Sequence, residues 1–129
     1  MARQTFTSGQ VLTAVEMNQV DANAGWNLDY NAQTGTTYTL VLTDAGKLVT
    51  LNNASAIALT VPTNASVAFA VGDQINLLQL GAGQVTVAGD AGVTVSSEGA
   101  KLKLKAQYAI GTLVKTGTDG WVLVGNLAA

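Results

Sequence analysis

The chain contains neither cysteine nor histidine. Without cysteine it can form neither a disulfide nor a thiolate metal site. Without histidine it lacks the commonest general base and the commonest transition-metal ligand. We therefore expect no enzymatic activity, no metal and no cofactor.

Charge is scarce as well. Lysine, arginine, aspartate and glutamate make up 11% of the 129 residues, against roughly 25% in a typical soluble domain. Only six residues are basic and the net charge is −2, so we expect no nucleic-acid binding, which needs clustered lysine and arginine. Uncharged strand edges recruit further strands unless something covers them. The composition thus predicts a building block, covered by identical copies or by a larger assembly.

Long apolar runs are also missing, and aromatic rings are few. No apolar run approaches the ~20 residues that a membrane-spanning helix needs, and residues 1–5 lack the apolar core of a signal peptide. Aromatic residues amount to 5%, so the core must consist mainly of small aliphatic side chains. A chain of this length suits a single folded domain.

The composition changes near residue 35 and divides the chain into residues 1–35 and 36–129. Thr13 and Glu16 form a capping-box pattern, which predicts the start of a short helix. Apolar residues follow at helical spacing as far as Ala24. We expect an extended arm before this helix and a linker at residues 31–35 after it.

Residues 36–129 show short Val, Thr and Leu stretches separated by Gly, Asp and Asn, which is typical of an all-β domain. Asp119-Gly120 is a strong hairpin signal. Residues 85–87 and 93–95 repeat the same Val-Thr-Val sequence and are expected to form a close pair, although two copies are too few to establish a solenoid. The predicted fold is mainly β: a short N-terminal arm and helix, then an antiparallel β-sandwich or jelly-roll-like barrel. The expected strands span residues 37–42, 47–52, 57–61, 74–80, 84–88, 93–96, 101–105, 108–115 and 121–124.

Four segments resemble virion proteins of tailed bacteriophages. Residues 6–18, FTSGQVLTAVEMN, resemble an N-terminal segment of such proteins. Residues 38–61, 71–95 and 117–129 are similar to a β-domain of tail fibres, minor tail proteins and head-decoration proteins. The resemblance implies a non-enzymatic virion component, often a homotrimer, which is attached through its N-terminal part and displays the β-domain outward.

The small size of the chain favours a capsid decoration, or cement, protein over a long tail fibre. Such a protein would bind the major capsid protein and stabilise the assembled head, since it binds the lattice and not its dissociated subunits. It would be made in the cytoplasm of the bacterial host and reside on the virion. The alternative is a tail-fibre or minor tail protein that binds a host-surface glycan, for which the sequence offers exposed aromatics only around Trp26 and Trp121.

Contacts to the particle or between subunits are expected in the N-terminal part. Trp26, Tyr30 and Tyr38 could present a ring to a partner, but more simply they seal the helix against the β-domain or the trimer axis. The residues predicted to carry attachment or trimer contacts are Phe6, Val11, Leu12, Met17, Val20 and Trp26.

Lys101, Lys103 and Lys105 alternate along one predicted strand and should share a face, with the intervening leucines opposite. A solvated face that protects a sheet edge explains them, and contact with an acidic capsid surface or an anionic glycan is the other possibility.

Acidic residues close to glycines are explained by turn chemistry, because Asp caps its own backbone in tight turns. They match no calcium-loop pattern. A pair of carboxylates for glycoside hydrolysis could be drawn only from Asp90 and Glu98, which nothing else supports. The turn acids are Asp44, Asp73, Asp90 and Asp119.

Overall fold

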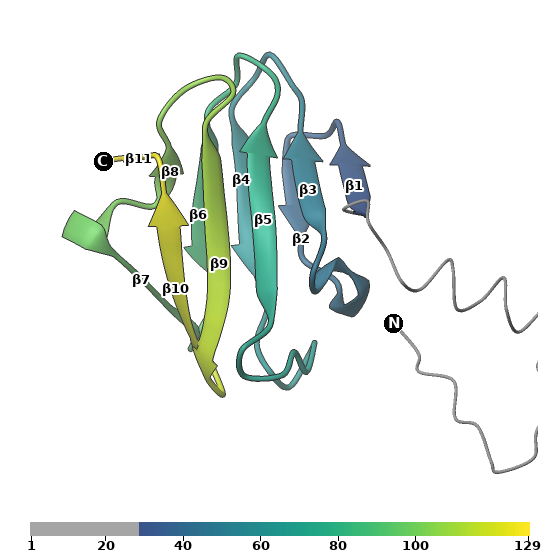
Figure 1. Ribbon diagram of the computed structural model, residues 1–129, viewed down its shortest axis with the longest axis vertical. Helices are drawn as coiled ribbons and strands as arrows, with labels where there is room; N and C mark the ends of the chain where they lie inside the picture. The colour runs from purple at the N-terminus through teal and green to yellow at the C-terminus, as the bar shows by residue number, and fades with distance from the viewer. Residues whose placement is uncertain (1–28) are drawn as a thin grey trace, which may run out of the picture.

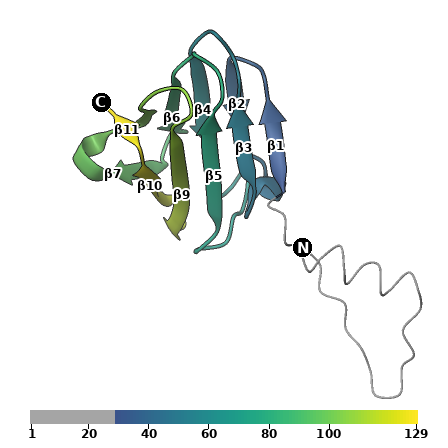
Figure 2. The ribbon, with the colours of Figure 1, turned by 45° about the horizontal axis from the view of Figure 1, so that its top comes forward.

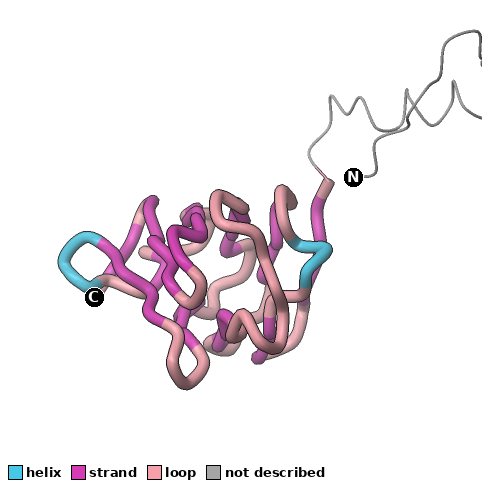
Figure 3. Tube along the Cα trace, turned by 90° about the horizontal axis from the view of Figure 1, so that it is seen from below, coloured by secondary structure: helices cyan, strands magenta, loops and turns pink. Residues whose placement is uncertain are grey.

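The computed structural model describes residues 29–129, and the predicted arm and helix lie outside this range. Two β-sheets pack face to face (Figures 1 and 3). Sheet A contains, in spatial order, β1 (Tyr30–Gln33), β3 (Leu48–Leu51), β5 (Gln74–Gln79), β9 (Ile110–Gly117), β10 (Gly120–Gly125) and β7 (Thr94–Ser97). Sheet B contains β11 (Leu127–Ala128), β8 (Lys103–Leu104), β6 (Val85–Gly89), β4 (Ile57–Val61) and β2 (Thr37–Thr39). The mainly-β sandwich expected from the sequence is confirmed.

The strand pairing is mixed, which differs from the antiparallel arrangement that we predicted. The first six strands alternate between the sheets, so that β1, β3 and β5 run parallel in sheet A while β2, β4 and β6 run parallel in sheet B. Figures 1 and 2 show β1, β3 and β5 side by side and running in the same direction. Antiparallel pairing occurs in sheet A where β9 joins β5 and forms a hairpin with β10, and in sheet B where β8 joins β6 and β11. At the edge of sheet A, β7 pairs in parallel with β10. A chain that crosses to the other sheet and back returns in its original direction, which explains the parallel pairs.

Two further expectations are corrected. The two Val-Thr-Val segments do not form a pair, because β6 lies in sheet B and β7 in sheet A. Residues 30–33 belong to β1, paired with β3, and are not part of a linker. The hairpin predicted at Asp119-Gly120 is present between β9 and β10.

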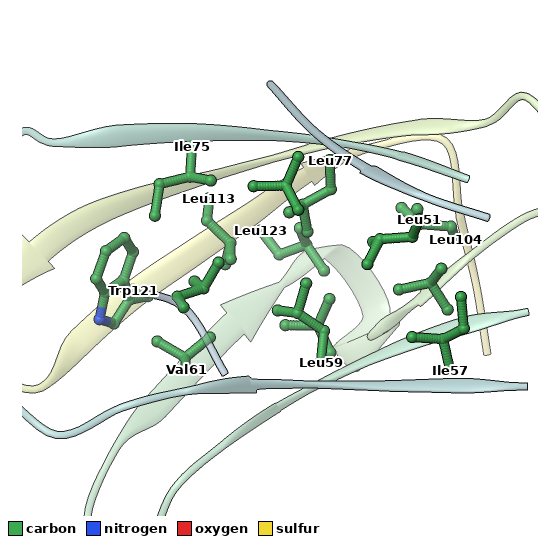
Figure 4. Packing of buried hydrophobic residues seen from close by; sticks show 14 of the residues in the cluster. Leu51, Ile57, Leu59, Val61, Ile75, Leu77, Leu104, Leu113, Trp121 and Leu123 are labelled. Atoms are coloured by element: carbon green, nitrogen blue, oxygen red, sulfur yellow. The ribbon is translucent and has the colours of Figure 1, made fainter. Parts of the chain in front are cut away.

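The core lies between the sheets and is built from the inward residues of alternating strands (Figure 4). Trp121 is 2% exposed and meets Phe69 edge to face, with 5.3 Å between ring centroids. Each fully buried aliphatic side chain contributes about 1.5–3 kcal/mol before entropy is subtracted. The labelled members are Leu51, Ile57, Leu59, Val61, Ile75, Leu77, Leu104, Leu113, Trp121 and Leu123.

A polar network closes the core at its β1–β2 end. Asp44, in the short 3-10 helix η1 (Leu42–Asp44), is 1% exposed. Its Oδ2 accepts hydrogen bonds from the Tyr38 hydroxyl at 2.6 Å and from the Val41 N–H at 3.0 Å. Asn31 Nδ2 donates to Asp44 Oδ1 at 3.0 Å and to the Tyr38 hydroxyl at 2.8 Å. Since buried polar groups need such partners, this network fastens η1 to both β1 and β2.

Candidate interaction surface

The strands of sheet A contain almost no charged residues. Its six strands read YNAQ, LVTL, QINLLQ, IGTLVKTG, GWVLVG and TVSS, with Lys115 as their single charged residue. Lys115 points into the core and is 2% exposed. Charges instead stand immediately before β1, β3, β5 and β10, at Asp29, Lys47, Asp73 and Asp119. The strands of sheet A therefore place no charged residue on its solvent-facing side, and the charged residues beside that side include Glu98 and Lys101, which line a hollow with Val124.

This outer face of sheet A is defined by the residues that alternate with the buried ones. Ile110 lies opposite Leu78, and Val114 lies opposite Val122, so apolar side chains adjoin across neighbouring strands. Thr112 donates to Asn76 Oδ1 at 2.8 Å among them. Tyr30, Ile110 and Val124 are 66%, 43% and 50% exposed. The large apolar residues of this face are Tyr30, Leu48, Leu78, Ile110, Val114, Val122 and Val124.

The outer face of sheet B has a different character. Along β2, β4 and β6 it presents only threonine and alanine, and β8 adds Lys103, which pairs with Thr86. A face of small and polar side chains is an ordinary solvated surface, whereas contiguous exposed apolar residues mark interaction sites. The two sides of the sandwich are thus chemically distinct.

Tyr108 lies in the loop before β9, at the end of sheet A where β9 begins, and is 70% exposed. Its backbone is left-handed, with φ of 71°, a conformation that costs an L-residue roughly 1–2 kcal/mol. The backbone N–H of Tyr108 donates to the Gln79 carbonyl at 2.6 Å, and Gln107 Nε2 donates to the Leu80 carbonyl at 2.9 Å. These bonds hold the strained loop. The sequence pattern missed Tyr108 because it was assigned to a strand.

The structure describes only some of the residues predicted to make contacts. Phe6, Val11, Leu12, Met17, Val20 and Trp26 lie outside the described residues. Tyr30 is exposed on the outer face of sheet A, whereas Tyr38 points into the polar network. Trp121 is buried, so the prediction of an exposed glycan-binding ring at that position is wrong. The physical reason is that Trp121 occupies an inward position of β10.

The three lysines lie in and around a short strand. Lys101 and Lys105 are exposed and Lys103 is half-buried, while Leu104 between them is fully buried. The predicted alternation is therefore present, although β8 contains only Lys103 and Leu104. The Lys105 backbone N–H donates to the Asn126 carbonyl at 3.0 Å, which carries the pairing with β11 one residue further.

Turn chemistry explains Asp73 and Asp90 but not Asp119, and Asp44 belongs to the buried polar network. Asp73 Oδ2 accepts from the Ala70 N–H at 2.9 Å, and Asp90 Oδ1 accepts from the Ala91 N–H at 2.8 Å. Asp119 Oδ1 instead accepts from the N–H of Asn64, in a distant loop, at 2.8 Å. Within residues 29–129 no three acidic, histidine or cysteine side chains gather closely enough to hold a metal ion.

The buried Lys115 anchors the loop between β4 and β5. Its Nζ donates to Asn64 Oδ1 and to the Phe69 carbonyl, both at 2.7 Å, and lies 5.9 Å from the Trp121 ring centroid. Nothing in the sequence distinguished this lysine from a solvated one. Its inward position on β9 follows only from the strand register.

Replacing Lys115 tests this anchor. We expect Lys115→Met to lower the free energy of unfolding by about 1–3 kcal/mol, because one buried and one half-buried acceptor lose their donor. Chemical denaturation measures the change, with Lys105→Met as the exposed control. Equal stability of the two variants would contradict a structural role for Lys115.

A shallow hollow of about 120 Å³ lies beside η2 (Glu98–Ala100). Its volume is well below the roughly 300 Å³ at which small-molecule pockets begin. It is therefore a poor site for an extended ligand. The lining residues are Glu98, Lys101, Leu123, Val124, Gly125 and Leu127.

Comparison with protein-family models and with curated proteins produced no match for the chain. The part of the chain that the structure describes holds no helix with the length and apolarity needed to cross a membrane.

Proposed function

We propose that this protein is a non-enzymatic structural component of a bacteriophage particle, most simply a homotrimeric decoration protein that binds and stabilises the capsid. The observation that carries the proposal is the charge-free outer face of sheet A. A single chain in water gains little from such a face, whereas a subunit of an assembly buries it. The resemblance of residues 6–18 and of the β-domain to virion proteins supports the same function.

In this function the protein acts by mass action. A subunit that binds several neighbouring capsid proteins favours the assembled shell over free subunits, and multiple contacts raise its apparent affinity. The N-terminal residues Phe6, Val11, Leu12, Met17 and Val20 would carry the attachment.

Tyr108 supports a second candidate function, a tail protein that binds a host-surface glycan. An exposed ring held in a strained loop beside Gln107 offers a stacking platform with amide hydrogen-bonding groups nearby. On this hypothesis Tyr108→Ala abolishes glycan binding on an array and leaves the circular-dichroism spectrum unchanged.

Cryo-electron microscopy of the purified particle tests the proposed function. Density for this chain at regular positions over the icosahedral shell, in hundreds of copies, is the expected result. Density confined to the tail would favour the second candidate, and absence from the particle would overturn both.

Substitutions in the full chain then locate the attachment. We expect Val11→Asp with Leu12→Asp to abolish binding to undecorated particles, because two apolar contacts become charged. The control replaces Lys101, Lys103 and Lys105 with serine and should bind normally if these lysines form a solvated face. Binding lost only in the lysine variant, measured by cosedimentation, would assign attachment to the acidic capsid surface instead.

A further inference from the structure

We infer that the outer face of sheet A is the contact surface between copies of this chain. The inference deepens the proposed function, since it rests on the protein acting in several copies, and it names the surface through which the copies meet. The occupant of the face is a second copy of the chain. The outer face of sheet B and the lysines beside β8 then stay free for solvent or for another component of the particle.

The size of the face is sufficient for such a contact. Sheet A has six strands, and β5 and β10 each contain six residues. With about 4.8 Å between strands and about 3.3 Å per residue, the face measures roughly 24 by 20 Å. In a pair of copies, two such faces bury about 1,000 Å² together, the lower limit for a specific interface; in a trimer, each face would share its area between two neighbours around the three-fold axis.

Charge favours an identical partner. A face without charge is compatible with itself, because two copies bring no like charges together and leave no ion buried without a counterion. The charged residues Asp29, Lys47, Asp73 and Asp119 stand at one end of the strands, outside the face. They match the polar rim that surrounds the apolar centre of a protein interface.

The other surfaces of the described chain fit this role less well. The outer face of sheet B offers side chains no larger than threonine along β2, β4 and β6. The far end of that sheet carries Lys101, Lys103 and Lys105, which would repel their counterparts in a symmetric contact. Among the large exposed apolar residues, Tyr30, Ile110 and Val124 share one face. The others are scattered over η1 and loops: Val41, Leu42, Val71 and Tyr108.

The absence of cysteine from the natural chain allows a direct test. Thr112→Cys places a single thiol at the centre of the sheet A face, and Thr86→Cys places one at the matched, equally half-buried position of sheet B. In the assembled protein we expect maleimide to modify the thiol of Thr112→Cys at least about tenfold more slowly than that of Thr86→Cys. The two rates should converge when dilution dissociates the copies. Equal rates at every concentration would overturn the inference.

Charge introduced into the face provides a second, independent test. Val124→Glu should shift the sedimentation coefficient to that of the monomer, because association would bury the new carboxylate at an apolar contact. Ala88→Glu, exposed on the outer face of sheet B, is the control and should sediment like the unmodified chain. An oligomer that survives Val124→Glu with its affinity unchanged would contradict the inference.

A failure of this inference can be distinguished from a failure of the proposed function. If the thiol of Thr112→Cys reacts freely in the isolated protein but is protected on the particle, a different protein covers the face, so the inference fails and the virion function stands. If the isolated chain assembles through this face but the particle contains no copies, the inference stands and the proposed function fails.

Discussion

A Gly83→Ala chain should lose about 3 kcal/mol of unfolding free energy, the upper range for overpacking a tight site. A Cβ on Gly83 would overlap the Ser55 carbonyl oxygen and come within 2.7 Å of the Asn53 carbonyl oxygen. Both are backbone atoms of the turn that stacks against residues 80–84, so no side-chain rotation can relieve the overlap. The Gly83 N–H, which donates to the Asn53 carbonyl at 2.8 Å, would also be displaced.

The turn that contains Asn53 also explains why the loss of stability should extend to neighbouring strands. Asn53 Nδ2 donates to the Thr34 carbonyl at 2.8 Å, so Asn53 joins the turn before β2 to the turn before β6. Pushing the turns apart weakens parallel pairing on both sides. Gly117→Ala is the matched control, because a Cβ there meets nothing within 4 Å. Urea denaturation compares the two variants, and a Gly83→Ala chain as stable as Gly117→Ala would contradict the stacked turns.

The second large effect is expected for Asp44→Ala, which should cost about 3 kcal/mol or more in unfolding free energy. Removing this buried carboxylate leaves the Tyr38 hydroxyl and the Val41 N–H without their acceptor and takes one of two acceptors from Asn31 Nδ2. Each buried unsatisfied group costs about 1–3 kcal/mol. Asp90→Ala serves as the control, since Asp90 is exposed and bonds only its neighbour's N–H. Thermal unfolding measures both, and a small, equal loss would show that the network does not close the core.

The network also predicts a pH dependence. Burial, together with the Asp44 carboxylate, raises the pKa of the Tyr38 phenol well above its ordinary value of 10.0. As pH rises above that value, Tyr38 ionises in the unfolded chain but stays protonated in the folded one. The unfolded state then binds fewer protons, so stability falls with rising pH, by at most about 1.4 kcal/mol per unit for this group.

Tyr38→Phe should remove this part of the alkaline slope. The measurement is the urea midpoint at several pH values from neutrality to above the ordinary tyrosine pKa. An unchanged slope in Tyr38→Phe would assign the pH dependence to other groups.

The sequence was sufficient for the β class and for most strand positions, since alternation, glycines and Pro62 mark where strands lie and end. Alternation reports which residues point inward, but it says nothing about strand direction. The parallel pairing therefore escaped prediction. The parallel pairs have a regular spacing: residues 48–51 pair with residues 76–79, and residues 57–61 pair with residues 85–89, at the same separation along the chain. Asn53 and Gly81 occupy corresponding places in the intervening turns.

The sequence predicted that the protein has an interaction surface, but not which residues form it. The low charge content indicated that some surface must be covered, but which residues share that surface depends on strand order. Leu78 and Ile110 lie far apart in sequence and become neighbours only because β9 inserts beside β5. The inward Lys115 was missed because its position follows only from the strand register, and the exposed Tyr108 was missed because it was assigned to a strand.

Sedimentation velocity of the full chain over a wide concentration range tests the central claim most directly. If the charge-free face of sheet A joins copies of the protein, the main species has a mass that is a multiple of the 13.1 kDa chain, and it dissociates on dilution. A single 13.1 kDa species at all concentrations would contradict the account.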